Sequence, residues 1–219
     1  MQATYIDLSH TIYDGLKTYQ GMPASRICDF LSREASRALY EDGTEFHIAH
    51  YDFVANSGTY IDCPFHRYEG GKDLSQTQLG RFVDQPGIVV KAIGVKEIGP
   101  DFFQKVDVKD KAVLVRTDWD QHWEQEIYHQ EHPYLNEEAA LFLKAAGAKI
   151  VGIDSYNIDN TRGKTRPVHS ILLAQEILIV DHLCNLSSLP ETDFLFNAIP
   201  PKIKGAGTFP VRAYAKIFK

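Results

Sequence analysis

Residues 136–153 read NEEAALFLKAAGAKIVGI, and this stretch decides the class of fold. Asn136 suits the N-cap of a helix, because its side-chain oxygen can accept a backbone N–H of the first turn. The two glutamates that follow place negative charge at the helix start, and Gly147 can adopt the left-handed conformation that ends a helix. The β-branched run Lys149–Ile153 follows at once. The stretch therefore predicts a helix that leads directly into a strand.

Short β-branched or aromatic runs recur on both sides of this stretch, and they predict seven more strands. These runs are Thr4–Leu8, Glu45–Ala55, Gly87–Ile93, Ala112–Arg116, Ile177–Val180, Phe194–Ile199 and Arg212–Phe218. Further helices are expected at Arg33–Tyr40 and His169–Gln175. Because helices alternate with strands, we predict a single α/β domain, residues 1–219, with a mixed or partly parallel sheet.

The predicted strand Glu45–Ala55 differs from an ordinary surface strand. Alternate residues of a strand point to opposite faces, and here both faces mix apolar with polar side chains. We expect this strand to be covered on both sides or to line a site.

The composition limits the classes of function. Of the 219 residues, 44% are hydrophobic and 24% are charged, which is typical of a globular protein. The net charge of −6, without a basic cluster, argues against a nucleic-acid partner. The chain begins with no secretory signal and has no apolar run long enough for a membrane span, so we expect a soluble cytoplasmic protein without a membrane partner. The widely spaced Cys28, Cys63 and Cys184 suit a reducing compartment.

The densest group of polar residues lies in NSGTYIDCPFH, residues 56–66. Asp62 and His66 follow a Gly-Thr turn, and we expect them at the close of a strand, where ligand crevices form in α/β sheets. Downstream, His169 and Asp181 are separated by one helix-to-strand reversal, so their side chains can converge. Carboxylates and imidazoles suit Zn²⁺ or Mn²⁺. Spacing alone is weak evidence for a metal site. It also fits a purely structural role for both residues, with a hydrogen-bonded histidine and an aspartate at the end of a strand.

The run SGTYIDCPFH, residues 57–66, resembles the signature H-x-G-T-H-x-D-x-P-x-H of the cyclase family, also called the kynurenine formamidase family. Other segments are similar to segments of that family in the same order: DLSH (7–10), VLVRTDW (113–119), VGIDSYNID (151–159), VHSILL (168–173) and FPVRAYA (209–215). The resemblance covers nearly the whole chain. It implies a mixed-sheet swivelling β/β/α domain, assembly into homodimers or larger oligomers such as tetramers, and metal-dependent hydrolysis of an amide or lactone.

The resemblance also implies roles for single residues. Asp62, His169 and Asp181 match metal-ligand positions, and Asp181 stands where the family usually has glutamate. His66 matches the catalytic histidine. Tyr19 falls where relatives often place a tryptophan that stacks on the substrate. The implied cofactor is a divalent metal, Zn²⁺ or Mn²⁺.

Both histidines that open the family signature are absent here, and Asn56 and Tyr60 take their places. An asparagine offers a neutral carbonyl oxygen, and a phenol must lose its proton before it binds a metal well. Two outcomes stay open. One is a single ion in an oxygen-rich site with Asn56 as a donor, which shifts the preference toward Mn²⁺ or Mg²⁺. The other is a metal-free pocket in which Tyr60 and His66 bind a small aromatic ligand or act as weak acid–base groups.

The function that follows from the resemblance is hydrolysis of a linear amide, of the arylformamidase type that acts on N-formylkynurenine in tryptophan catabolism. A metal would polarise the carbonyl and lower the pKa of a bound water, and His66 would protonate the departing nitrogen. The alternatives are a lactone hydrolase on the same scaffold and a non-catalytic relative that binds a small aromatic ligand. In each case the partner is a small molecule.

Overall fold

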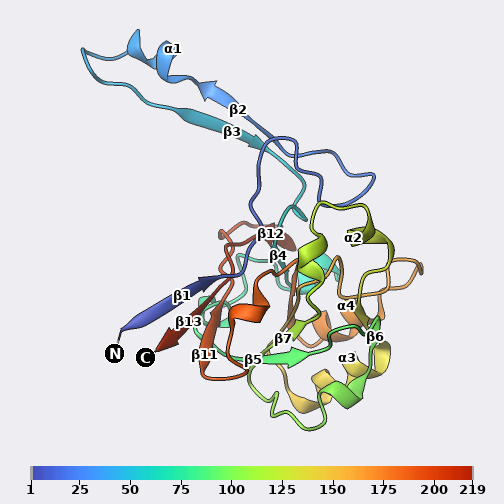
Figure 1. Ribbon diagram of the computed structural model, residues 1–219. Coiled ribbons are helices and arrows are strands. Elements are labelled where there is room, and N and C mark those ends of the chain that lie inside the picture. The colour runs from blue at the N-terminus through green and yellow to red at the C-terminus, as the bar shows by residue number, and fades with distance from the viewer. Residues whose placement is uncertain (1, 219) are drawn as a thin grey trace. The chain divides into compact units, whose positions relative to one another are not determined.

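The computed structural model describes residues 2–218, and its four α-helices lie between strands along the chain (Figure 1). The strands are β1 (Ala3–Asp7), β2 (Arg26–Leu31), β3 (Ile48–Asp52), β4 (Tyr60–Asp62), β5 (Gln85–Lys91), β6 (Glu97–Ile98), β7 (Ala112–Arg116), β8 (Tyr134–Leu135), β9 (Ile150–Ile153), β10 (Leu178–Asp181), β11 (Phe194–Asn197), β12 (Thr208–Pro210) and β13 (Tyr214–Phe218). The α-helices are α1 (Arg33–Arg37), α2 (Ile127–Gln130), α3 (Glu137–Ala146) and α4 (Pro167–Leu173). Short 3₁₀ helices are η1 (Pro64–His66), η2 (Leu79–Arg81), η3 (Pro100–Phe102), η4 (Trp119–His122) and η5 (Leu186–Ser188).

The chain forms two compact units. The first contains residues 2–10 and 58–218 of the described part, and the second contains Thr11–Ser57. The second unit consists of a two-stranded antiparallel sheet, β2 with β3, and the short helix α1.

A mixed sheet forms the frame of the first unit, with the strand order β1-β13-β11-β5-β7-β9-β10-β4-β12 among the described residues. The neighbours β5, β7, β9 and β10 run parallel to one another. The strands on either side, β11 and β4, pair with them in the antiparallel direction. This sheet and the helices between its strands confirm the predicted α/β fold class.

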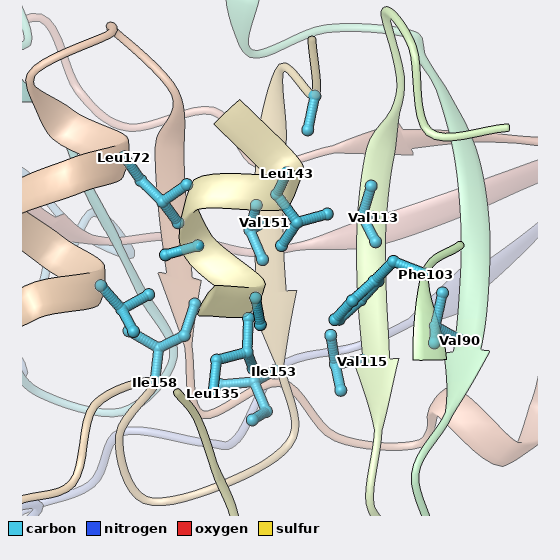
Figure 2. Packing of buried hydrophobic residues seen from close by; sticks show 14 of the residues in the cluster. Val90, Phe103, Val113, Val115, Leu135, Leu143, Val151, Ile153, Ile158 and Leu172 are labelled. Atoms are coloured by element: carbon cyan, nitrogen blue, oxygen red, sulfur yellow. The ribbon is translucent and has the colours of Figure 1, made fainter. Parts of the chain in front are cut away.

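The core lies on both faces of this sheet. Figure 2 shows Val113 and Val115 of β7 and Val151 and Ile153 of β9 packed with Leu143 of α3. The alternate residues of the same strands point into a second cluster of buried side chains on the opposite face. Burial on both faces explains why the central strands are continuous apolar runs, as is usual for parallel sheets.

Helix α3 forms where the capping signals predict it. The Asn136 side chain accepts a hydrogen bond from the backbone N–H of Ala139, and Gly147 ends the helix with a φ of 81°. Helix α4 begins at Pro167, because proline suits the first helical position, and it ends at Leu173 rather than at Gln175. The predicted helix at residues 33–40 ends early, at Arg37.

All eight strands expected from the sequence are present, with shifted ends. Asp62 lies at the close of a strand, as the sequence predicts, but that strand is not among the eight predicted ones. Residues 60–62 themselves form β4, because their backbone pairs with β10 on one side and β12 on the other. In the second unit, β3 exposes Ile48 and Tyr51, so within one chain it is not covered on both sides.

Among residues 2–218, no helix combines the length and apolar character that crossing a membrane requires.

Helix α3 offers a matched pair of leucines for a test of the core. Leu143 is fully buried, whereas Leu141 is 46% exposed. We expect Leu143→Ala to lower the free energy of unfolding by about 2–5 kcal/mol, because it removes buried methyl groups and leaves a cavity. Leu141→Ala should change it by less than about 0.5 kcal/mol. Urea unfolding of both variants measures the difference, and equal losses would contradict the packing described.

Candidate functional site

The register of β4 against β10 brings the candidate residues to one face of the sheet. Tyr60 lies directly opposite Asp181, and Asp62 lies opposite Ile179. Since side chains two apart in a strand share a face, Tyr60, Asp62 and Asp181 all lie on the side that α4 covers. Ile61 points the other way, into the second core cluster.

Asp159 fixes the position of His169 at the start of α4. Its carboxylate accepts hydrogen bonds from the backbone N–H groups of Val168 (2.9 Å) and His169 (3.0 Å) and from His169 Nδ1 (2.6 Å). Nδ1 therefore carries a proton, and Nε2 faces the strands. Nε2 lies 3.5 Å from Asp62 Oδ2 and 4.0 Å from Asp181 Oδ2. A carboxylate behind the imidazole is typical of histidines that bind a metal.

Thr208 of β12 joins Asp62 to His66. Its hydroxyl donates to Asp62 Oδ1 and lies 2.7 Å from His66 Nδ1. Because the single hydroxyl proton is donated to Asp62, the threonine oxygen must accept the Nδ1 proton of His66. The other ring nitrogen, Nε2, is then the one that can take or give a proton in chemistry. The His66 and His169 rings lie 5.8 Å apart.

The group around His169 contains more carboxylates than imidazoles. Asp62, Asp159 and Asp181 are all fully buried, and His169 is the imidazole that contacts all three. Burial favours the neutral imidazole, but the hydrogen bond to Asp159, the nearby Asp62 carboxylate and the charge of Asp181 outweigh it and raise the pKa of His169 to about 10. Burial, reinforced by the charge of Asp62, raises the pKa of Asp181 to about 7.

Two oxygens of the group have no hydrogen-bond partner among the described residues, Asp62 Oδ2 and Asp181 Oδ1. A buried carboxylate oxygen without a partner carries a large desolvation cost. Asp62, His66 and His169 offer ligand atoms within 4.8 Å of one another. Unpartnered carboxylate oxygens beside an oriented imidazole fit a divalent cation.

Of the remaining predicted residues, Tyr60 lies within this group, whereas Asn56 and Tyr19 do not belong to the same unit. Tyr60 is buried, and its hydroxyl donates to Asp181 Oδ2 at 3.0 Å. Asn56 and Tyr19 belong to the second unit. Their roles as oxygen donor and substrate-stacking aromatic stay predictions.

Sequence reasoning did not identify Asp159 or Thr208 as functional residues. Asp159 is the last residue of the segment VGIDSYNID, which is similar to a segment of the family. That position is the one sequence feature that points to a functional role for Asp159. Thr208 lies 146 positions from Asp62, and no local pattern marks that contact.

A second acidic group contains Asp118, Asp120 and Asp154, at the carboxyl ends of β7 and β9. Asp154 accepts hydrogen bonds from Thr117 N (2.7 Å) and Oγ1 (2.6 Å) and from Asp118 N (3.0 Å). Asp118 also pairs with Arg116 at 2.6 Å. These contacts hold the end of β7 to the end of β9, so we assign this group a structural role.

Beside this second group is a cavity of about 620 Å³, and Asp118 and Asp120 line it together with Trp119 and Arg116. The described residues that line it include no member of the group around His169. The site built from β4, β10 and α4 is therefore separate from this cavity.

Comparison with known proteins agrees with this architecture. Residues 6–160 match the family described as "Putative cyclase", and the chain belongs to that family. The kynurenine formamidase of Bacillus cereus is 25% identical over 213 residues, which are 95% of each chain. That of Geobacillus thermodenitrificans is 28% identical over 160 residues, 72% of this chain and 74% of the relative.

Solved structures share the fold. Isatin hydrolase A from Labrenzia aggregata, bound to benzyl benzoate, superposes with a TM-score of 0.83 at 20% identity, over 99% of this chain and 94% of that one. A structure described as a potential metal-dependent hydrolase with cyclase activity gives a TM-score of 0.80 at 24% identity over the full length of both chains. At these identities the likeness establishes the fold.

The buried Asp154 makes stability depend on pH. Burial raises the pKa of its carboxyl from 3.8 to about 7. The folded state therefore favours protonated Asp154, and this contribution is complete below about pH 4 and is lost as the pH rises through about 7. Asp154→Asn destabilises through its lost hydrogen bonds but lacks this titration. We expect the stability gap between the two proteins to narrow by roughly 1–4 kcal/mol between about pH 4 and pH 8.

Urea unfolding of both proteins across that pH range measures the gap. A gap that is constant, or that widens as the pH rises, would contradict the environment described for Asp154.

Proposed function

We propose that this protein is a metal-dependent hydrolase of a linear amide, of the arylformamidase type. The observation that carries the proposal is the group of three buried carboxylates around one imidazole, with two oxygens that have no hydrogen-bond partner among residues 2–218. A cation bound there would satisfy these oxygens and offset the excess negative charge. A metal-free pocket would leave the desolvation cost of both oxygens unrelieved, so it is not favoured.

Asp62, His169 and Asp181 would hold the ion, which we propose to be Zn²⁺ or Mn²⁺ because the donors are carboxylate oxygens and one imidazole nitrogen. When bound, such an ion polarises a substrate carbonyl and lowers the pKa of a coordinated water. Asp159 keeps His169 Nε2 directed at the site by holding Nδ1.

His66 is proposed as the general acid and base. Its Nδ1 is engaged by Thr208, and its side chain is 34% exposed, so Nε2 can reach a bound small molecule. An imidazole exchanges protons near neutral pH, which suits delivery of a proton to the departing nitrogen of an amide. A formamide of an aromatic amine needs that proton, because the free anilide is a poor leaving group.

The choice of an aryl formamide rests on relatives named kynurenine formamidase that match almost the whole chain. We therefore propose N-formylkynurenine, and a place in tryptophan catabolism, as the first substrate and pathway to test. The free cysteines Cys28, Cys63 and Cys184 fit a reducing compartment, and we propose a cytoplasmic location.

The hydrolase proposal is tested by metal analysis of the purified protein together with a formamide-hydrolysis assay. His66→Ala should lower kcat by about 10²–10⁴-fold, because it removes the proton donor and leaves the proposed ligands in place. The control is His122→Ala, since that imidazole contacts Gln125 and is no member of the site. If no metal co-purifies and the wild type is as inert as His66→Ala, the proposal fails.

The second unit supports the proposal that the protein is a homo-oligomer. Eight large apolar side chains of this unit are exposed, against seven in the much longer described part of the first unit. They are Tyr13, Met22, Phe30, Leu39, Tyr40, Phe46, Ile48 and Tyr51. A two-stranded sheet is marginally stable in water by itself, and concentrated apolar exposure is typical of interfaces.

We propose that a second copy of this chain covers these side chains. Together they expose on the order of 800 Å², which is about what each partner contributes to a standard stable interface. The expectation that the strand at residues 45–55 is covered on both sides would then be met in the dimer.

Sedimentation analysis tests the dimer. The double variant Phe30→Ser/Tyr51→Ser should weaken dimerisation at least about 100-fold, because it removes two of the most exposed apolar side chains of the unit. Leu79→Ser/Leu141→Ser, which alters exposed leucines of the first unit, should leave dimerisation unchanged. A wild type that stays monomeric at high concentration would contradict the proposal.

A further inference from the structure

Tyr60 lies inside the carboxylate–imidazole group although the family signature has a histidine at its position. Its side chain is 1% exposed, and its hydroxyl donates to Asp181 Oδ2 at 3.0 Å. The two residues are direct partners across β4 and β10, so the strand register holds the phenol beside the carboxylate.

Neighbouring donor atoms of this group lie at separations close to those of ligands that share one ion. Tyr60 Oη lies 3.0 Å from Asp181 Oδ2, which lies 4.0 Å from His169 Nε2. His169 Nε2 in turn lies 3.5 Å from Asp62 Oδ2. With metal–ligand bonds of about 2.0–2.2 Å, neighbouring donors of a tetrahedral or octahedral ion lie about 3.0–3.6 Å apart. The widest of the three gaps needs to close by only about 0.5 Å.

We propose that Tyr60 is itself a metal ligand and that the centre holds one divalent ion per chain through Tyr60 Oη, Asp62, Asp181 and His169 Nε2. This inference rests on the proposed metal-dependent function and assigns Tyr60 to the ion instead of to the substrate. On binding, the Tyr60 O–H bond is replaced by an O–metal bond and the His169 Nε2–H bond by an N–metal bond, and both protons leave to solvent. No electron is transferred.

Two of the other imidazole nitrogens at the site are already engaged, which argues against a second ion. His169 Nδ1 is held by Asp159, and His66 Nδ1 is held by Thr208. The imidazoles that the family signature places at positions 56 and 60 are absent. The described residues of the group around His169 therefore leave no imidazole-rich ligand set for a second ion.

Copper(II) reports directly on a phenolate ligand, because a phenolate bound to copper gives a ligand-to-metal charge-transfer absorption band in the visible range. Carboxylates and imidazoles do not give this band. Copper is also the divalent first-row ion that such donors bind most tightly. We therefore propose titration of the metal-stripped full chain with Cu²⁺ alone, with absorption, proton release and metal content measured together.

The expected result is one Cu²⁺ per chain, one more proton released by the wild type than by Tyr60→Phe, and a visible band that saturates at that stoichiometry. Tyr60→Phe should lose the band and bind Cu²⁺ at least about 10-fold more weakly, because it removes one donor. The matched control is Tyr128→Phe, a buried tyrosine whose hydroxyl contacts His182 at 2.9 Å; it should keep the band.

The outcomes separate this inference from the function on which it rests. Copper that binds the wild type without a visible band shows that Tyr60 is no ligand, and two ions per chain overturn the single-ion centre; in both cases a metal-dependent hydrolase still stands. Failure to bind Cu²⁺, Zn²⁺ or Mn²⁺ at all overturns both proposals. The wild-type band does not depend on whether Tyr60→Phe folds, and the melting temperature of the variant checks that it does.

Discussion

The antiparallel register between β4 and β10 is the constraint on which the site depends. It sets Tyr60 opposite Asp181 and, two residues on, places Asp62 on the same face. A slip of one residue would turn these side chains into the apolar cluster on the other face and bring Ile61 into the site. The core therefore fixes the register of these strands. The apolar residues that alternate with Tyr60, Asp62 and Asp181 cannot move to the polar side without a large loss of buried area.

Helix α4 covers the same face of the sheet, and the Asp159 carboxylate contacts both the start of this helix and the His169 side chain. One carboxylate caps two backbone N–H groups and orients an imidazole, so a single side chain starts the helix and aims His169 Nε2 at Asp62 and Asp181. Thr208 of β12 orients His66 in a similar way, through contacts with Asp62 and with His66 Nδ1. The reactive atoms are thus held by strands and a helix start, which position them more precisely than a loop would.

The parts that the sequence predicted are those specified by local patterns. Helix α3 needs only its own cap at Asn136 and its own stop at Gly147. Strand β4 is not predicted from the sequence, because three residues are too few to show a periodic pattern. Its conformation depends on partner strands more than a hundred positions away. For the site, Asp62, His66, His169 and Asp181 were named from motif resemblance, whereas Thr208 depends on a contact that only the folded chain creates.

A buried acidic group of this kind is weak evidence for stability and is consistent with a binding role. Three carboxylates around one imidazole lose more solvation than their mutual contacts restore, and apolar side chains of similar size would often be as stable or better. The two oxygens without a hydrogen-bond partner in the described chain show that the cost is not met internally. A phenol at position 60 keeps an oxygen donor where an apolar residue would have closed the site. The group thus keeps several polar donor atoms although both histidines that open the family signature are missing, and this is the basis for proposing Tyr60 as a ligand.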